Sequence, residues 1–465
     1  MRRFLWLGWI AFLFLICSGC GDTFRPIIIP NPPVFPDPRA AHTVVTVSDN
    51  GAISPGSVLV VDVAGDAEVS IGNVHVAPVH GVQQSANQVL VLNQATTTTS
   101  APSLSKVFFN GTTINGAPGT ISLPPNSAPN FVAVAPSDTI AYVTLPNYAP
   151  DPSHPQNIVP AVGVVNTQSN VLVATIAVGS CPATVVVTPD KNKLYVASNT
   201  LLCSPPAVGG SLSAFNSLDQ SPRTITGALS SPPVWLSARS DSQRVYVLEQ
   251  SGTLAWLDTT LTTGDTLTEE PTISISNPTT MLYDGHLNRL YIPGGSEVKV
   301  VDVAQSPPIV LATIAITPVM PSTRNAQDPC STTATTALHT VTAAALPDGS
   351  RAYFGTYYED AAGNVCPQVT VINTSNNSVK AVTAIPGFPN YDTACASTRF
   401  RFAMAAGGDS SKAYLASCDG GGVNVIDTST DLFLANLPAP FSNRSPIPPS
   451  QLAPPQNPVF LIAGP

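Results

Sequence analysis

The sequence predicts an all-β protein assembled from repeated antiparallel units, and three observations support that prediction. The 465 residues include 47 prolines and 31 glycines, which interrupt helices and central strands and mark many turns. Short runs rich in Val, Ile and Thr, residues that favour strands, alternate with polar turns. One apolar string that ends in Asp or Asn recurs along the chain, which indicates a repeat architecture.

The repeat has three recognisable parts. The first is the apolar string, and its terminal Asx residue can accept hydrogen bonds from the backbone that follows and so start a turn. Its eight copies end at Asp62, Asn110, Asn166, Asn216, Asp258, Asp302, Asn373 and Asp427. The second part precedes it and is a polar turn followed by a strand with a tyrosine. These tyrosines are Tyr142, Tyr195, Tyr246, Tyr291, Tyr353 and Tyr414, and Gln88–Val91 is a degenerate copy without one. The third part follows the Asx residue, and residues 172–179 and 310–317 are nearly the same string.

Each unit therefore contains four strands: one before the polar turn, the tyrosine strand, the Asx-ended strand and an outer strand. Four antiparallel strands that repeat every ~40–60 residues are typical of a β-propeller blade. Ala141–Thr144 and Leu194–Ser198 resemble the YVTN family of β-propeller repeats, in which a P-D-G turn precedes Y-V-T-N. The resemblance covers nearly everything from about residue 42 onward. It implies a propeller, but a fold does not by itself specify a function.

The two ends of the repeat region predict how the ring closes. The first unit starts at the tyrosine-strand equivalent, Thr43–Val47, and lacks the strand that should precede it. Val459–Ala463 is an orphan strand of the missing kind. If these two segments pair, N-terminal and C-terminal strands close the ring and no sheet edge is exposed. We expect eight blades, with seven as the alternative because the unit at 79–123 is degenerate.

Charged residues are scarce, which excludes some function classes. They make up 10% of the chain, against about 25% in an average globular protein. The net charge is −9, and no cluster of Lys or Arg follows Arg3. Nucleic-acid binding requires a basic stripe, so we exclude nucleic acid as a partner.

The N-terminus predicts export. Arg2 and Arg3 precede an apolar run, Phe4–Ile16, which is shorter than the about 20 residues of a membrane-spanning helix and suits a signal peptide. The run leads into Cys17-Ser18-Gly19-Cys20, which resembles the bacterial lipoprotein signal, although that family usually has Leu where Cys17 stands. The resemblance implies lipidation at Cys20, with a plain secretory signal as the alternative. In that family an Asp after the lipidated Cys signals retention in the inner membrane, so with Gly21 at this position the resemblance implies the outer membrane or the periplasmic face of the envelope.

A proline-rich stretch connects this signal to the repeats. Its prolines favour extended, semi-rigid conformations, so it suits a spacer between a lipid and a folded head. They are Pro26, Pro30, Pro32, Pro33, Pro36 and Pro38. We therefore divide the chain into a signal peptide (1–19), a lipid-anchored linker (20–40) and a single β-propeller domain (41–465).

Six cysteines lie in the propeller region, and their even number suggests disulfides in an oxidising compartment. They are Cys181, Cys203, Cys330, Cys366, Cys395 and Cys418. The sequence cannot fix the connectivity, because six cysteines allow fifteen patterns. Pairing of nearest neighbours (181–203, 330–366 and 395–418) is the simplest. No C-x-x-C motif is present, which argues against a zinc ribbon or an attached c-type haem.

No catalytic motif stands out. The chain has no G-x-S-x-G elbow, Walker loop or G-x-G-x-x-G. We interpret its histidines as surface or turn residues, although His75 and His80 form a conceivable metal pair. The carboxylate pair Glu269-Glu270 lies in a Thr-rich segment, where we expect a solvated loop. We expect no catalytic residue, no cofactor and no metal ligand.

Three long insertions are the candidate binding loops, because binding residues concentrate on loops held by a rigid scaffold. They span residues 146–160, 320–337 and 386–398, and Tyr148, His154, Phe388 and Tyr391 are the candidate binding residues. Decorated connections without a binding role are the alternative.

These observations predict a monomeric binding or interaction scaffold, anchored at the cell envelope by its lipid, for an unidentified protein or glycan. The alternative, which the resemblance to YVTN propellers implies, is a lactonase-like or hydrolase-like enzyme with a metal at the channel mouth. Several carboxylate or histidine side chains converging on the channel axis would favour that enzyme.

Overall fold

The computed structural model describes most of the repeat region, and every described residue belongs to one body, Arg39–Pro465. The described residues are 43–50, 54–95, 101–116, 118–135, 138–202, 209–319, 328–331, 337–389, 401–418, 420–438 and 457–463. Over these ranges the regular structure is β-strand, apart from two 3₁₀ turns, η1 (Thr200–Leu202) and η3 (Pro329–Ser331). No helix in these ranges has the length and apolar character needed to cross a membrane.

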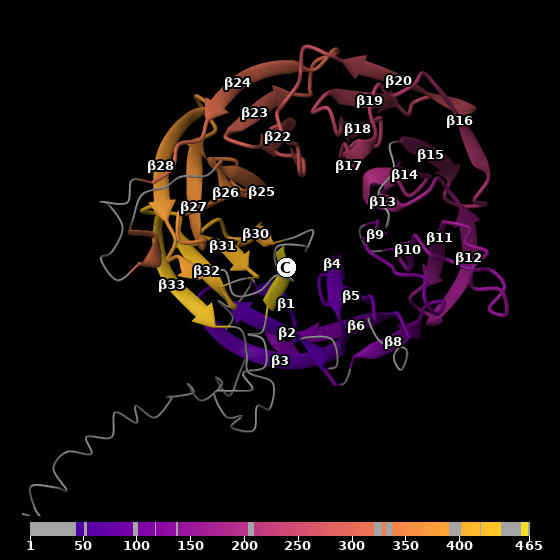
Figure 1. The fold of residues 1–465 in the computed structure, drawn as a ribbon, viewed down its shortest axis with the longest axis horizontal. Helices are drawn as coiled ribbons and strands as arrows, with labels where there is room; N and C mark the ends of the chain where they lie inside the picture. The colour runs from indigo at the N-terminus through magenta and orange to yellow at the C-terminus, as the bar shows by residue number, and fades with distance from the viewer. Residues whose placement is uncertain are drawn as a thin grey trace, which may run out of the picture. The chain divides into compact units, whose positions relative to one another are not determined.

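The strands surround a central channel in four concentric positions (Figure 1). The innermost strands are β34 (Asn457–Ala463), β4 (Pro78–Ser85), β9 (Val132–Val134), β13 (Pro182–Val187), β17 (Pro233–Ala238), β21 (Leu282–Asp284), β25 (His339–Ala345) and β30 (Phe402–Ala406). The second strands are β1 (Thr43–Asp49), β5 (Gln88–Asn93), β10 (Ile140–Leu145), β14 (Lys193–Asn199), β18 (Arg244–Glu249), β22 (Arg289–Gly294), β26 (Arg351–Glu359) and β31 (Lys412–Ser417). The third strands are β2 (Pro55–Asp62), β6 (Ser103–Asn110), β11 (Ala161–Asn166), β15 (Gly210–Asn216), β19 (Leu254–Asp258), β23 (Glu297–Asp302), β27 (Asn364–Asn373) and β32 (Gly422–Asp427). The outer strands are β3 (Ala67–Val76), β7 (Thr113–Ile114), β8 (Gly119–Ser122), β12 (Val171–Ala177), β16 (Pro222–Thr226), β20 (Gly264–Glu270), β24 (Ile309–Ala315), β28 (Ser378–Ala384) and β33 (Leu432–Pro438).

Among the described residues, one strand from each position makes an antiparallel blade, and we number the blades 1 to 8 around the ring in chain order. Blades 4 and 5 share one eight-stranded sheet, because the outer strands β16 and β20 pair in parallel. In blade 2 the outer position is divided between β7 and β8, which both pair with β6. The short β29 (Phe388–Pro389) pairs with β27 in blade 7. The prediction of an all-β propeller of four-stranded blades is confirmed.

The ring closes in blade 1 through both ends of the repeat region. The C-terminal strand β34 pairs antiparallel with β1, and the register places Val44 opposite Ala463 and Val45 opposite Ile462. The predicted pairing of the first and last strands is therefore confirmed. Blade 1 thus has its innermost strand from the far end of the sequence, and this pairing leaves no open edge on β1.

The two faces of the ring differ in their connections. Because neighbouring strands in a blade are antiparallel, the turns from first to second strand and from third to fourth strand lie on one face, the turn face. The other face, the loop face, carries the connections between second and third strands and between successive blades. The insertion at 146–160 joins β10 to β11, and the other two insertions join successive blades. All three long insertions therefore lead from the loop face.

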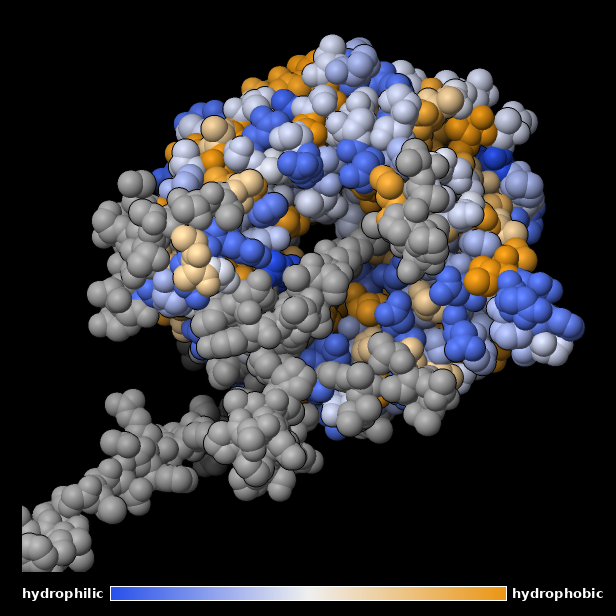
Figure 2. Space-filling model, in the orientation of Figure 1, coloured by the Kyte–Doolittle hydropathy of each residue, from blue (hydrophilic) through white to orange (hydrophobic). Residues whose placement is uncertain are grey.

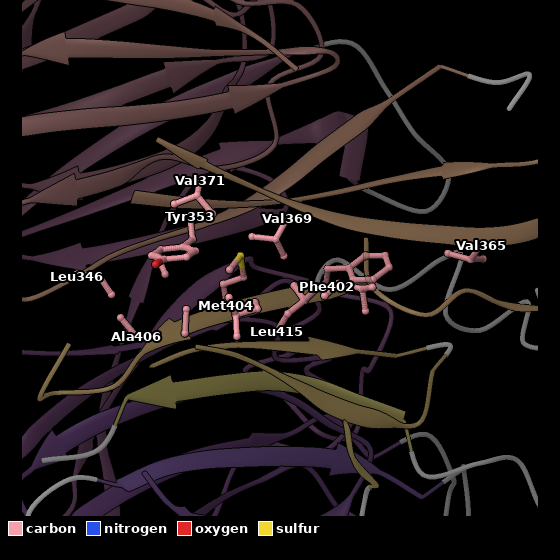
Figure 3. Close-up of a cluster of buried hydrophobic side chains, with 13 residues drawn as sticks. Leu346, Tyr353, Val365, Val369, Val371, Phe402, Met404, Ala406 and Leu415 are labelled. Atoms are coloured by element: carbon pink, nitrogen blue, oxygen red, sulfur yellow. The ribbon is translucent and has the colours of Figure 1, made fainter. Parts of the chain in front are cut away.

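The hydrophobic core lies between neighbouring blades. Figure 3 shows one such cluster, in which Tyr353 and Val371 of blade 7 face Met404 and Leu415 of blade 8. The repeat tyrosines sit in these interfaces, and Tyr353 is fully buried. This explains the tyrosine in the repeat: its ring fills the space between two sheets, and its hydroxyl reaches the next blade.

In blades 4 to 8 a basic residue two positions before the tyrosine joins the blade to the next one. The turn after the third strand of the next blade supplies backbone carbonyl oxygens, and the basic side chain donates a hydrogen bond to one of them. The pairs are Lys193 with Thr259, Arg244 with Gln305, Arg289 with Thr374, Arg351 with Thr428, and Lys412 with Val63. Blade 2 has no such pair, and there Lys106 on the third strand donates to the carbonyl of Thr167 in blade 3 at 2.7 Å. Many of the few positive charges are therefore used to hold blades together.

Candidate functional site

A cavity of about 320 Å³ lies in the central channel. Its walls come mostly from the innermost strands of blades 1, 2, 5, 6, 7 and 8 and from the connections that lead into them, with Tyr357 from the second strand β26, and the opening at the centre of the ring is visible in Figure 2. The residues that line it are His80, Trp235, Thr279, Thr280, Met281, Leu282, Val341, Thr342, Ala343, Tyr357, Arg401, Phe402, Ala403, Met404, Phe460 and Leu461. Most of them stand near the loop-face ends of their strands, since innermost strands run from the loop face to the turn face. The cavity and the long insertions thus share one face.

Aromatic rings make up one side of the cavity. The imidazole of His80 stacks on Phe131, with ring centroids 4.0 Å apart, and lies 4.5 Å from the ring of Phe460. Phe131 in turn meets Trp235 edge to face at 5.7 Å. The backbone N–H of Val132 donates to Nδ1 of His80 at 3.3 Å, so the neutral imidazole carries its hydrogen on Nε2. Packing on both sides fixes these rings in place.

A second aromatic group carries the positive charge of the cavity. Tyr357 is stacked between His339 at 5.0 Å and Phe402 at 5.1 Å. The guanidinium of Arg401 lies over the ring of Tyr357, 4.9 Å from its centroid, and Nη1 approaches Oε1 of Glu359 at 3.3 Å. Arg401 is 7% exposed, and it is the one Lys or Arg among the described residues that line the cavity. Its burial against an aromatic face strengthens its interaction with an anionic group.

The cavity offers few ligands for a metal ion. Of the described residues that line it, one is a histidine and none is a carboxylate. Within the described ranges, one group of three His, Cys, Asp or Glu side chains lies within ligand distance, formed by Cys330, Asp360 and Cys366. Its two sulfur atoms are bonded to each other, which removes them as metal ligands. The lining of the cavity is suited to binding a small group, because it combines flat apolar surfaces, threonine hydroxyls and one guanidinium.

The predicted loop residues lie elsewhere. Tyr148 is half-buried and packs on the hydrophobic cluster between blades 2 and 3. His154 is 57% exposed, and its Nδ1 lies 2.6 Å from the carboxylate of Asp151. Phe388 is in β29, opposite Val365, and Tyr391 lies outside the described residues. The structure does not bring Tyr148 and His154 to the wall of the cavity.

One disulfide joins the loop-face connections of blade 7. Cys330, in the insertion that leads into the blade, is bonded to Cys366 near the start of β27, so this predicted pair is confirmed. Cys181 and Cys418 are also disulfide-bonded. Their predicted partners, Cys203 and Cys395, lie outside the described residues, as does the predicted lipidation site Cys20.

Two expectations about polar residues were wrong. His80 is not a surface histidine: it is 4% exposed, because it lies on an innermost strand that faces the channel. Glu269 and Glu270 are not in a solvated loop: both are half-buried at the end of β20. The second error arose because the outer strand β20 has a polar, Thr-rich sequence that resembles a loop.

The sequence motifs did not identify the cavity residues. The repeat signatures mark the second and third strands, whereas the cavity is built from the short innermost strands, which carry no motif. A weak signal exists: Phe131, Trp235 and Phe402 each stand at or near the start of an innermost strand.

The comparisons with solved structures agree with the fold. Apo AztD from Citrobacter koseri is similar with a TM-score of 0.57 and 12% identity, over 91% of this chain and 98% of that chain. Dihydro-heme d1 dehydrogenase NirN in complex with DHE is similar with a TM-score of 0.58 and 12% identity, over 93% of this chain and 77% of that chain. At this identity the likeness concerns the fold alone. No protein-family model matches the sequence, and no curated protein matches it.

Proposed function

We propose that this protein is an exported, lipid-anchored binding protein whose propeller, built from YVTN-type repeats, takes its ligand in the aromatic cavity on the loop face. The observation that carries this proposal is the pairing of fixed aromatic rings with one buried guanidinium: Trp235, Tyr357 and Phe402 beside Arg401. Binding sites for small groups are concave, mostly apolar and few in number, with a small number of placed polar groups.

The chemistry of the cavity indicates the part of the ligand that it holds. Aromatic side chains stack on flat rings, and the guanidinium of Arg401 pairs with a carboxylate or phosphate. The volume of about 320 Å³ is at the lower end of the range for ligand sites, about 300–1,000 Å³. We therefore expect the cavity to hold one acidic ring-shaped group, such as the terminal sugar of an acidic glycan.

Export and anchoring rest on the N-terminal sequence, with support from the cysteine chemistry. A disulfide such as Cys330–Cys366 persists in oxidising compartments. Cys20 would carry the lipid, and the proline-rich residues 20–40 would hold the propeller away from the membrane.

Ligand binding by the exported full chain tests this proposal, with Cys20→Ser to prevent lipidation. An array of acidic and neutral glycans supplies the ligands, and isothermal titration calorimetry measures binding by the parent and by each variant. We expect acidic glycans to bind, and Trp235→Ala and Arg401→Gln to weaken binding at least ~10-fold, or about 1.4 kcal/mol.

His154→Ala is the matched control, because His154 is an exposed loop residue away from the cavity. It should bind like the parent protein. If His154→Ala abolishes binding while the two cavity variants bind normally, the ligand sits on the loops and the cavity proposal is wrong. If no glycan binds, the proposed ligand class is wrong. Far-UV circular dichroism of each variant confirms that the fold is kept.

A further inference from the structure

Two carboxylates meet on the loop-face side of blade 5, and no Lys, Arg or His of the described residues forms an ion pair with either of them. Glu249 is the last residue of β18 and is fully buried. Glu269 is in the outer strand β20 of the same blade. Ser230, in the connection that leads into blade 5, contacts both: its hydroxyl donates to Oε2 of Glu249 at 3.0 Å, and its backbone N–H donates to Oε1 of Glu269.

One oxygen of this pair has no partner among the described residues. Oε1 of Glu249 is buried and makes no hydrogen bond with any of them. Among the described residues, no ion pair involves Glu249, Glu269 or the adjacent Glu270. The hydroxyl of Thr272 donates to Glu270, and the backbone of Ser231 donates to the carboxylate of Glu249.

This arrangement is unfavourable unless a positive species occupies it. A buried carboxylate costs several kcal/mol unless it is paired, and a second carboxylate beside it adds repulsion. The two donors from Ser230 favour the ionised form of each carboxylate. Burial raises the pKa of Glu249 to about 7, and the neighbouring Glu269 contributes to that rise. The raised pKa has the same origin as the unfavourable energy: negative charge is buried without a positive partner.

The pair faces the interface between blades 4 and 5. Val245 and Val247 lie on the same side of β18 as Glu249, because every second residue of a strand shares one face. Both valines, and Leu267 two residues before Glu269, belong to the hydrophobic cluster of that interface. A cavity of about 510 Å³ opens at the same interface and is lined by Ser230 and Leu267. An ion can therefore reach the neighbourhood of the pair from solvent through Ser230.

We propose that Glu249, Glu269 and the hydroxyl of Ser230 bind a divalent cation of the calcium type. The ligands are all oxygen atoms, which a hard cation prefers, and two carboxylates supply the charge that balances it. Zinc is disfavoured, because no histidine or cysteine belongs to this group. The bound ion would tie the connection into blade 5 to two strands of that blade, in the region where blades 4 and 5 separate around the cavity.

The test is a calcium titration of the exported full chain carrying Cys20→Ser, by calorimetry and by thermal unfolding. We expect one site with a Kd of about 10⁻⁴–10⁻³ M, the range of extracellular calcium modules, and a rise in Tm as calcium is added. Glu249→Gln and Glu269→Gln should each weaken binding at least ~10-fold. Glu297→Gln, on β23 of blade 6, is the matched control and should bind as the parent does.

The outcomes separate a bound cation from a shared proton. If Glu249 holds a proton that it shares with Glu269, calcium at about 10 mM produces no heat and no change in Tm, and the proposal is overturned. It is also overturned if both glutamine variants bind calcium like the parent. Should Glu249→Gln fail to fold, the half-buried Glu269→Gln gives the same answer. Neither residue lines the aromatic cavity, so glycan binding is measured separately and its failure leaves this result unaffected.

Discussion

The same substitution, Tyr→Phe, at equivalent positions of the repeat should give different losses of stability. It removes one hydroxyl and leaves the ring, so it isolates the hydrogen bond from the packing. Tyr353 donates to Oδ1 of Asp431 at 2.6 Å, and both residues are fully buried. The hydroxyl of Tyr246 bonds to no carboxylate of the described residues: it donates to the backbone carbonyl of Val303 at 3.5 Å, and the guanidinium groups of Arg239 and Arg244 lie close to it. The ring environment is alike, since both tyrosines are fully buried between blades.

The magnitudes follow from the acceptors. A hydrogen bond to a charged group contributes about 1.5–3 kcal/mol, and a neutral one about 0.5–1.5 kcal/mol with good geometry. Asp431 keeps ion pairs with Arg351 at 3.3 Å and Lys380 at 2.6 Å after the hydroxyl is lost, which limits the penalty. We expect Tyr353→Phe to cost about 2 kcal/mol, and Tyr246→Phe less than about 0.5 kcal/mol because 3.5 Å is at the limit of a hydrogen bond.

Equilibrium unfolding in urea, followed by circular dichroism, measures the difference. The transition midpoints of the two variants are compared with the parent at equal slope, because a changed slope indicates a different unfolded state or an intermediate. Tyr195→Phe serves as a third point: its hydroxyl donates to Oδ2 of Asp265 at 3.0 Å, and it should behave like Tyr353→Phe. Equal losses at Tyr353 and Tyr246 would refute the reasoning, because the effect would then come from the ring and not from the acceptor.

Three further predictions concern closure, acid stability and the disulfide. Ile462→Ala in the closing strand should lower the free energy of unfolding by about 2–5 kcal/mol, because Ile462 is buried between β1 and blade 2, and urea unfolding measures it. Hydrogen bonds from the hydroxyl and backbone N–H of Thr260 lower the pKa of Asp258 below 3.8, so its contribution to stability is present above pH about 3.8 and is lost as pH falls through the lowered value. Asp258→Asn should therefore differ from the parent at pH 6 and converge with it as the pH falls below the lowered pKa of Asp258; a constant difference in acid unfolding would contradict this. Replacing Cys330 and Cys366 together by Ser should cost about 3–4 kcal/mol for their separation of 36 residues, and reduction of the parent should lower Tm by at least as much as this double variant does, because it also breaks the disulfides of Cys181 and Cys418.

The sequence predicted the parts of the fold whose signals are local. Strings such as the one ending at Asp302 combine a strand with the turn that follows it. Because these strings repeat along the chain, they predict that the same four-stranded antiparallel sheet repeats as well. The pairing of Val459–Ala463 with Thr43–Val47 was also predictable, because the first blade lacked its innermost strand and Val459–Ala463 was a strand that belonged to no other blade. The Cys330–Cys366 pair followed from proximity in the chain.

The sequence predicted only part of the contacts between blades. The tyrosine of the repeat was evident, but its basic neighbour two positions earlier gained a meaning only when the next blade was in place. Lys106 is the clearest example, because it acts from a different strand and replaces a motif that blade 2 lacks. Its partner Thr167 lies in another blade, so no local pattern connects the two residues.

The sequence by itself therefore determined the class of fold, the repeat and the closure of the ring, because each depends on alternation and turns within a few dozen residues. Only the tertiary structure decided where binding chemistry gathers. His80, Trp235 and Arg401 come from three different blades and meet because a closed ring directs every innermost strand at one axis. Glu249 and Glu269 meet because strands that are not neighbours in the sheet turn the same face to the blade 4–5 interface. Such convergence depends on the geometry of closure, which sequence spacing does not encode.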